Sequence, residues 1–327
     1  MLPTLHPAHF EDSAEPWSVS AVVPSYNHAR FIERTLRSIF AQTLRPQHLL
    51  VIDDGSTDGS TGVIERVLKD APFSAEFISR GNRGLSATLN EGFASSSPHR
   101  FFAYLGSDDI WLPNFLEQRI TLLEQRPYAV LAYGNAYSID ADEHIIDRSV
   151  DWATYVDGDA RRMLLEGTAP MSPTVVYRRA ALDGMNWNEN SRLEDYEFYL
   201  RLSAKGEFAF DPAILSAWRQ HGTNSSEDSL MMMEEKISAL NSTSRLLNVD
   251  PGELSRLIRL ARFRGAQELM RRGFRAIAAK QGLPNLTAAR SASEVIKFLI
   301  GLATPESLLA RRRSRLRSAK TALHGRL

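Results

Sequence analysis

Short apolar runs alternate with amphipathic patterns along the first half of the chain. Apolar runs that end at polar or turn residues predict four strands, at residues 18–24, 48–53, 75–80 and 100–106. Between them, residues 28–43, 55–71 and 84–96 show apolar spacing of helical period or start at turn residues, which predicts three helices. We expect Pro24 to end the first strand, because proline cannot donate a ladder hydrogen bond.

This rhythm of strand and helix predicts the fold class. It indicates an α/β fold with a doubly wound, mostly parallel sheet that helices cover on both faces. Polar clusters follow three of the strands: PSYN at 24–27, DDGS at 53–56 and GSDD at 106–109. Because ligands of such sheets bind at the carboxyl ends of the strands, we expect these clusters to form one site.

The second half of the chain is less regular. Its patterns predict a helix at 111–127, a strand at 129–140, a helix at 192–206 and two short strands around a turn at 207–222. A linking helix is expected at 229–247, and a long helix that starts at Asp250 and Pro251 is expected to reach residue 281. We therefore divide the chain into a leader (1–17), an α/β domain (18–228) and a basic helical C-terminal extension (229–327).

Charge is distributed unevenly over the 327 residues. The totals of 39 basic and 39 acidic residues cancel, but residues 251–327 hold 17 Lys and Arg against 4 Asp and Glu. The chain is thus an acidic body with a basic extension. With 0 cysteines, disulfides, thiolate metal sites and cysteine nucleophiles are excluded.

Two features bear on the expected compartment. The leader contains acidic residues and prolines and has no apolar core, so we do not expect it to be a secretory signal. No apolar run approaches the ~18 residues that a membrane-spanning helix needs. We expect a cytoplasmic protein and leave open a peripheral attachment to the inner face of the membrane.

Two pairs of adjacent carboxylates follow predicted strands. Asp108 and Asp109 suit a divalent cation on a substrate's phosphates, although acids also stabilise the first turn of a helix. Asp53 and Asp54 suit ribose hydroxyls or a base N–H, although Asp, Gly and Ser are also common in tight turns.

Two further groups lie later in the chain. Glu194 and Asp195 begin a predicted helix, where a carboxylate that faces the crevice suits a general base and where helix capping is the simpler explanation. Arg219 suits phosphate recognition, and a neutral imidazole at His221 suits a metal ion.

Taken in order, six motifs resemble those of family-2 inverting glycosyltransferases, which have the GT-A fold. They are PSYN, VIDDGSTDGS, NRGLSATLNEG, GSDD, LEDYEFYLRL and WRQHGTN, and they span about residues 18–226. The resemblance implies a nucleotide-diphosphate sugar donor, a divalent cation (Mg²⁺ or Mn²⁺) and a single displacement that inverts the anomeric carbon. It also implies a glycan or lipid-linked saccharide acceptor, as in polysaccharide biosynthesis.

The resemblance also implies roles for individual residues. Asp109 would coordinate the metal, His221 would complete the metal site, and Asp195 would be the catalytic base. Glu194 and Arg219 would lie at the diphosphate or the acceptor. The residues implied in nucleotide binding are Pro24, Tyr26, Asn27, Asp53, Asp54, Arg80, Arg83 and Asp108.

Two departures from the family pattern stand out. Thr88-Leu89-Asn90 replaces the usual Ala-Arg-Asn, so we expect Arg80 or Arg83 to supply the missing nucleotide contact. The metal motif is Ser107-Asp108-Asp109 instead of Asp-X-Asp.

Two alternative functions stay open. One is a sugar nucleotidyltransferase, which is disfavoured because PSYNHARF lacks a glycine-rich phosphate loop. The other is a nucleotide-sugar-binding pseudoenzyme that acts through its basic tail.

The basic extension supports two interpretations. Its predicted long helix carries an apolar stripe with arginines around it, as helices on anionic membrane surfaces do. The same helices could instead pack on the acidic body or on a second subunit, and a homo-oligomer stays open. We do not expect a nucleic-acid partner, because no aromatic residues interleave the arginines.

Overall fold

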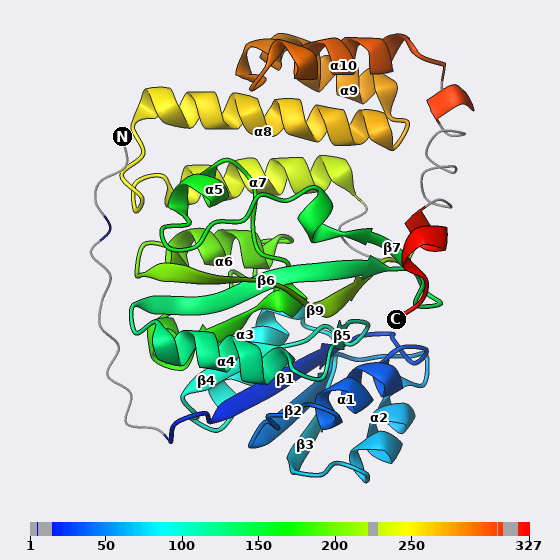
Figure 1. Ribbon diagram of the computed structural model, residues 1–327, viewed down its shortest axis with the longest axis vertical. Helices are drawn as coiled ribbons and strands as arrows, with labels where there is room; N and C mark the ends of the chain where they lie inside the picture. Colours follow the sequence, from blue (N-terminus) through cyan, green and yellow to red (C-terminus); the bar gives the residue numbers. More distant parts are fainter. Residues whose placement is uncertain (1–4, 6–14, 222–227, 306, 310–319) are drawn as a thin grey trace.

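A single mixed sheet organises the catalytic part of the chain (Figure 1). The computed structural model describes residues 5, 15–221, 228–305, 307–309 and 320–327. Within them the strand order is β3-β2-β1-β4-β8-β6-β9-β5, and β7 pairs with β6. The strands are β1 (Val19–Ser25), β2 (His48–Asp53), β3 (Ser74–Ser79), β4 (Phe101–Tyr104), β5 (Ile110–Trp111), β6 (Ala129–Ile139), β7 (Ile145–Arg148), β8 (Val176–Arg178) and β9 (Glu207–Arg219).

The sheet changes character along its width. Strands β3, β2, β1 and β4 are parallel, as the alternating pattern predicts. Strand β8 then pairs antiparallel with both β4 and β6, while β6 and β9 are parallel to each other. The predicted α/β class, with a wound sheet and a helical extension, is confirmed.

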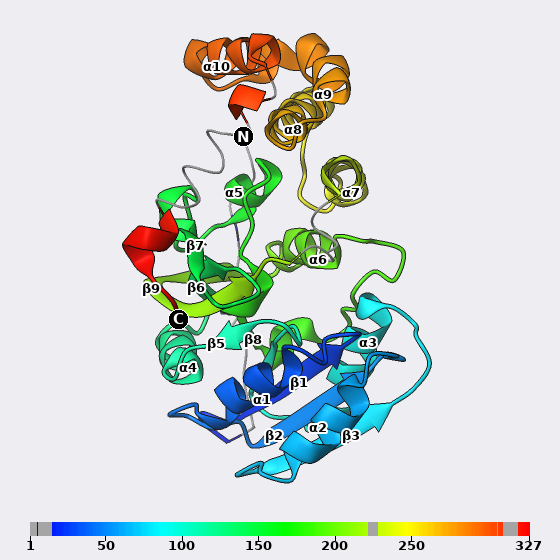
Figure 2. The same cartoon turned by 90° about the vertical axis from the view of Figure 1, so that its right-hand side faces the viewer.

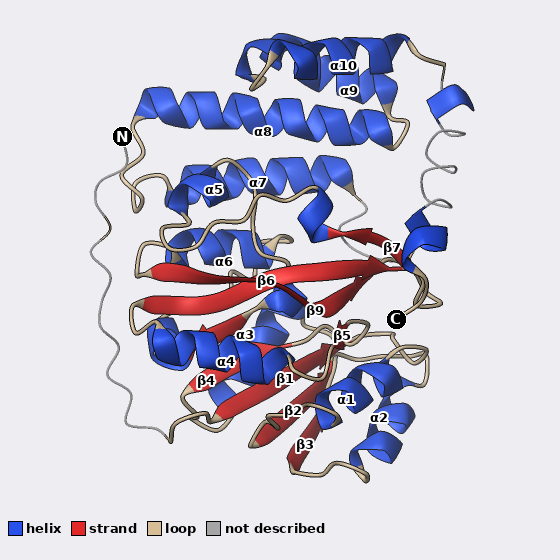
Figure 3. Ribbon diagram, viewed as in Figure 1, coloured by secondary structure: helices blue, strands red, loops and turns tan. Residues whose placement is uncertain are grey.

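Helices cover both faces of the sheet (Figure 3). Alternate β1 residues face opposite sides: Val19, Ala21 and Val23 join the cluster that contains α1 (Ile32–Phe40), α2 (Ser60–Leu68) and α4 (Phe115–Gln125). Val22 instead faces α3 (Leu85–Ser95) and the cluster that also holds α5 (Arg161–Leu165) and α6 (Glu194–Leu202). A strand buried on both faces explains why its sequence is almost continuously apolar.

Strand β1 continues through Pro24, contrary to expectation. Pro24 is paired in register with Ile52, and Ser25 with Asp53. The carbonyl of Val22 accepts a hydrogen bond from the Leu105 N–H, on the β4 side of the strand. The backbone nitrogen of Pro24, two residues further along, points to the same side. Pro24 lies beyond the last residue pair of the β1–β4 ladder. Its missing N–H is therefore not needed there.

The predicted turn within residues 207–222 is wrong. Strand β9 is one strand, and the Asp211-Pro212 step forms an irregularity in its pairing with β6. The Asn135 side chain donates to the Pro212 carbonyl at 2.8 Å, and the Ala213 N–H donates to Asp211 Oδ1 at 2.9 Å. These bonds satisfy the backbone where the ladder is interrupted, so the strand continues past the proline.

The helical extension stacks on the catalytic part instead of hanging from it (Figure 2). Helix α7 (Ser229–Thr243) packs on α6, and α8 (Pro251–Arg271) packs on α7. Leu240, Leu247 and Leu257 belong to the main core. A separate small cluster joins α8 to α9 (Arg275–Gly282) and α10 (Ala292–Ala303). The domain boundary near residue 228 stays a prediction, and the core is continuous across it.

The basic helix is shorter than predicted. Asp250 caps it by accepting from the Glu253 N–H at 3.0 Å, as expected. It ends at Arg271, because Gly273 adopts φ +95°. The Phe274 N–H then bonds the Leu269 carbonyl, and the Gly273 N–H bonds the Met270 carbonyl, which is the glycine-terminated end of a helix.

The end of the chain returns to the sheet. Gly325 accepts from the Ile145 N–H at 2.9 Å, and Lys320 pairs with Asp147 at 2.6 Å. The predictions for the leader and for the arginine run at 311–317 fall largely outside the described residues. Among the described helices, none combines the length and the apolarity that crossing a bilayer requires.

Two helical glycines give a matched test of the packing of α3 on the sheet. A Cβ on Gly92 would lie 2.6 Å from Val22 Cγ1, whereas a Cβ on Gly62 of α2 would meet nothing within 4 Å. We expect Gly92→Ala to lower the free energy of unfolding by about 1–3 kcal/mol. Gly62→Ala should leave it unchanged or raise it by about 0.5–1 kcal/mol. Urea denaturation measures both, and equal effects would contradict the packing described.

Candidate active site

The carboxyl ends of the parallel strands open into a cleft of about 1300 Å³. One end is formed by the loops after β1, β2 and β4. The start of α6 and the end of β9 contribute Glu194, Asp195, Trp218 and His221. The other end is formed by the segment around α5 and by α7 and α8 of the extension. All three polar clusters therefore contribute to one cleft, although Asp54 is the one member of the cluster after β2 that lines it.

The loop after β4 turns both of its carboxylates to one side. A Cβ on Gly106 would lie 3.1 Å from Asp108 Oδ1 and 3.1 Å from Asp109 Oδ2, so a larger residue would crowd both. The buried hydroxyl of Thr35 donates to the carbonyls of Ser107 (3.0 Å) and Asp109 (2.8 Å) and fixes the loop on α1. Burial, and then the charge of Asp108, raise the pKa of Asp109 well above its ordinary value.

Three metal-ligating side chains converge beside this loop. They are His28, Asp108 and His221, whose ligand atoms all lie within 4.8 Å of one another. His221 Nε2 is 2.8 Å from Asp108 Oδ2, and His28 Nδ1 is 3.7 Å from Asp108 Oδ1. Burial lowers the pKa of His28, which favours the neutral imidazole that a metal requires. The donor set fits a divalent cation.

This cluster differs from the predicted metal ligands in two ways. Asp108 occupies it, whereas the resemblance assigned the metal to Asp109. The Asp109 carboxylate lines the same cleft and accepts from the Arg219 N–H at 2.9 Å. His28 was not predicted at all, because a histidine four residues past the first predicted strand has no distinguishing pattern. Metal coordination by Asp109 stays a prediction.

The two aspartates after β2 are engaged within their loops. Asp53 accepts from the Ser56 N–H at 2.9 Å and from its hydroxyl at 2.5 Å. Asp54 accepts from the N–H groups of Arg83 and Gly84, both at 2.8 Å, and pairs with Arg80. Asp54 lines the cleft, and its bonds hold the loop that leads into α3.

The loop after β1 supplies the other residues predicted to bind the nucleotide. Pro24, Tyr26 and Asn27 line the cleft. Tyr26 is exposed, which leaves its ring available for stacking on a base. Asn27 has φ +52° and accepts from the Thr57 N–H at 2.8 Å, so it joins this loop to the one after β2.

The three predicted arginines make protein contacts. Arg80 bonds Asp54, Thr88 and Glu91, and Arg83 reaches Glu91 at 3.2 Å. Arg219 is buried, and its Nε donates to the Asp108 carbonyl at 2.7 Å. These contacts position the surrounding loops, while nucleotide contacts by Arg80 or Arg83 and a diphosphate contact by Arg219 stay predictions.

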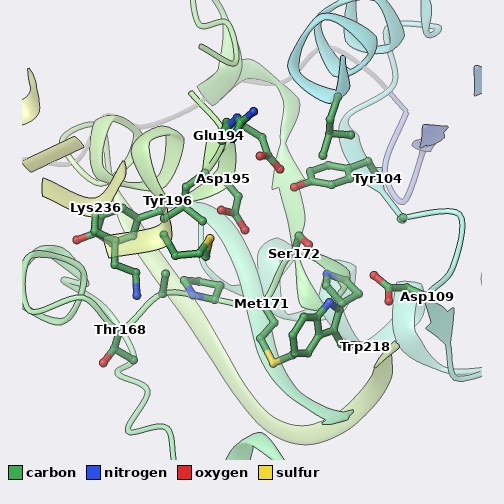
Figure 4. Close-up of a pocket in the computed structure, with 18 of the residues that line it drawn as sticks. Tyr104, Asp109, Thr168, Met171, Ser172, Glu194, Asp195, Tyr196, Trp218 and Lys236 are labelled. Atoms are coloured by element: carbon green, nitrogen blue, oxygen red, sulfur yellow. The ribbon is translucent and has the colours of Figure 1, made fainter. Parts of the chain in front are cut away.

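Glu194 and Asp195 begin α6 and face the cleft (Figure 4). Burial, together with the charge of Asp195, raises the pKa of Glu194 to about 8. Burial raises the pKa of Asp195 to about 6, and the nearby Lys236 opposes this rise. Near neutral pH the pair therefore holds one protonated carboxyl and one carboxylate, a combination that supports acid–base chemistry.

The chain belongs to glycosyl transferase family 2, whose model matches residues 20–184, just over half of the chain. An uncharacterized glycosyltransferase of Nostoc sp. is 31% identical over 50% of this chain and 52% of its own length. Chondroitin synthase of Escherichia coli is 26% identical over 66% of this chain and 31% of its own. The chain thus matches about half of the first relative and a third of the second.

Solved structures share the fold. Residues 1–349 of Staphylococcus aureus TarS, in complex with UDP, superpose with a TM-score of 0.58 at 16% identity, over 94% of this chain and 90% of that TarS chain. The mannosyltransferase PcManGT of Pyrobaculum calidifontis, in complex with GDP-Man and Mn²⁺, gives 0.60 at 16% identity, over 98% and 88%. The family membership favours glycosyl transfer over the nucleotidyl transfer that the sequence left as an alternative.

The raised pKa of Glu194 predicts a pH-dependent stability. The unfolded chain releases this proton near the ordinary pKa of 4.5, whereas the folded chain keeps it until about pH 8. Stability therefore falls as the pH rises between these values. Glu194→Gln cannot ionise, so we expect it to raise the free energy of unfolding by roughly 1–3 kcal/mol at pH 8.5 and to change it little at pH 5.

Denaturation at the two pH values measures this difference. Glu65→Gln, on an exposed position of α2, is the matched control and should show no pH-dependent gain. A Glu194→Gln variant with the same effect at both pH values would show that the ionisation of Glu194 does not cost stability.

Proposed function

We propose that the protein is an inverting glycosyltransferase that moves a sugar from a nucleotide-diphosphate sugar to a hydroxyl group of a glycan or lipid-linked acceptor. The observation that carries this proposal is that the half-buried pair Glu194 and Asp195 lines the same cleft as the carboxylates after β4. The family membership supports the reaction class, and donors of this kind are bound by TarS (UDP-GlcNAc) and PcManGT (GDP-Man).

In this proposal Asp195 is the general base. Its pKa of about 6 leaves it ionised at neutral pH, so it can take the proton of an acceptor hydroxyl. The hydroxyl oxygen then forms a bond to the anomeric carbon as the bond from that carbon to the diphosphate breaks. The nucleoside diphosphate leaves from the opposite face, which inverts the anomeric centre. Glu194 stays protonated beside Asp195 and can donate a hydrogen bond to the substrate.

The donor would bind between the loops after β1, β2 and β4. Tyr26 and Asn27 would contact the base and Asp54 the ribose. His28, Asp108 and His221 would hold a divalent cation, with Asp109 beside them. Two imidazoles with one carboxylate favour Mn²⁺ over Mg²⁺, which prefers oxygen ligands. A bound cation supplies charge neutralisation at the diphosphate.

The base assignment predicts a loss of turnover without a loss of donor binding. Asp195→Asn should lower the release of nucleoside diphosphate at least about 100-fold, because it removes proton abstraction. Turnover by the natural sequence should rise with pH through about 6, as Asp195 ionises. Release from UDP-GlcNAc and GDP-Man measures the rate, and calorimetry with UDP or GDP measures binding. Asp195→Asn with unchanged turnover would contradict the assignment.

Substitutions in the loop after β4 can separate the two candidate metal ligands. If the cluster of His28, Asp108 and His221 binds the ion, Asp108→Asn and His221→Ala should weaken Mn²⁺ binding more than Asp109→Asn does. The opposite order would favour the ligand that the sequence resemblance implies. Electron paramagnetic resonance of free Mn²⁺ measures binding without any substrate. Asp70→Asn, at an exposed position after α2, is the control and should bind Mn²⁺ normally.

A further inference from the structure

The two ends of the cleft differ in charge. The end at the loops after β2 and β4 carries Asp54, Asp108 and Asp109. The end near the helical extension is lined by six basic residues, which we call the basic wall: Arg162, Arg192, Lys236, Arg264, Arg271 and Arg290. Asp195 is close enough to Lys236 for its charge to act on that ammonium group, and two further acids, Asp159 and Glu166, line this second end. The wall therefore has an excess of positive charge.

Those two acids are already engaged. Glu166 pairs with Arg162 at 2.6 Å and with Arg290. Asp159 pairs at 2.7 Å with Arg161, which is not part of the wall. Neither acid pairs with Lys236 or Arg264, and Arg271 of the wall pairs with Glu268 at 2.8 Å.

Lys236 and Arg264 are the most informative members, because both are partly buried. Within the described residues, neither forms an ion pair with a carboxylate: Arg264 donates to the backbone carbonyl of Glu166, and the Lys236 ammonium lies 5.9 Å from the centre of the Tyr196 ring. Burial lowers the pKa of both, and the charge of Arg264 lowers that of Lys236 further, while the charges of Asp195 and Glu268 oppose the shift at Lys236. Two neighbouring cations withdrawn from water are stabilised by an anion.

We propose that the basic wall binds an anionic group, a phosphate or a carboxylate, carried by the acceptor substrate. This inference rests on the proposed function, because that function places the acceptor beside Asp195. In the view of Figure 4, Asp195 lies between Lys236 on one side and Asp109 on the other. The donor diphosphate belongs to the Asp109 side, so an anion on the Lys236 side belongs to the acceptor. Guanidinium groups bind phosphates and carboxylates through paired hydrogen bonds.

The surroundings of the wall fit a saccharide that carries this charge. Trp152 and Trp218 line the cleft and also an adjoining chamber of about 420 Å³ beside α7 and α8. Trp152 is exposed, and Trp218 is half-buried. Indole rings at such positions stack on the apolar faces of sugar rings. An acidic or phosphorylated glycan chain would thus find both ring contacts and charge contacts at this end.

Binding of defined probes tests the proposal without knowledge of the natural acceptor. The probes are glucose, glucuronate, glucose 6-phosphate and farnesyl phosphate, measured by calorimetry with the full chain and EDTA present. We expect the anionic probes to bind at least about tenfold more tightly than glucose. Arg264→Gln and Lys236→Gln should each weaken them about fivefold or more. A preference for glucuronate or glucose 6-phosphate would indicate an acidic glycan, and a preference for farnesyl phosphate a lipid-linked phosphate; either supports the wall.

Arg259→Gln is the matched control, because Arg259 is an exposed arginine of the same helix that does not line the cleft. It should keep the affinity of every probe. Equal affinities for glucose and the anionic probes, or equal losses in Arg259→Gln and Arg264→Gln, would overturn the proposal. So would a matching loss of UDP affinity in Arg264→Gln, which would assign the wall to the donor. Failure of nucleoside diphosphate release, by contrast, would refute the proposed function and leave the probe measurements interpretable.

Discussion

Mutual repulsion among carboxyl groups that share one cleft is the constraint on which the site depends. Asp108 and Asp109 follow β4, and Glu194 and Asp195 begin α6. Each of these places thus brings two consecutive carboxyl groups to the cleft. Each pair is too close to hold two unshielded charges away from water. Burial and the charge of Asp108 raise the pKa of Asp109, and two imidazoles lie beside Asp108 in a cluster that could hold a cation. In the second pair, burial and the charge of Asp195 raise the pKa of Glu194. The same repulsion thus underlies a candidate metal site and a candidate acid–base pair.

The sequence predicted the parts of this arrangement that depend on local pattern. Strand ends in a parallel sheet share one edge, so Asp54, Asp108 and Asp109 could be placed together before any coordinates existed. Asp195 was singled out because a carboxylate at a helix start is a local feature, while its role as base came from the family resemblance and stays a prediction. His28 was missed because its role depends on His221, almost two hundred residues away, and no spacing rule connects the two. Long-range partners set the chemistry of a histidine, and sequence pattern does not report them.

Errors in the predicted fold have the same cause. Pro212 was expected to break a strand, but pairing with β6 and the Asn135 side chain satisfy the backbone around it, so tertiary contacts override the local signal. Gly273 ends α8 through a left-handed conformation that a single glycine in a helical pattern does not guarantee. The apolar stripe of the basic helix was recognised, but its pattern is consistent both with a membrane surface and with packing on the protein itself. The structure shows that Leu257 joins the main core.

That last contact changes the role of the extension. The face of α8 that carries Leu257 is buried against the body and is not free for a membrane. Helices α9 and α10 keep exposed apolar residues such as Ile277 and Ile300, so membrane attachment of the extension stays a prediction. Residues of α7 and α8 also line the cleft. Lys236 of α7 and Arg264 of α8 line the cleft because α7 packs on α6, the helix that begins with Glu194 and Asp195, and α8 packs on α7. The packing of the extension on the body therefore also places these cations beside the proposed base. If the basic wall binds the acceptor, α7 and α8 would select the acceptor, while the loops at the end of the sheet would hold the donor.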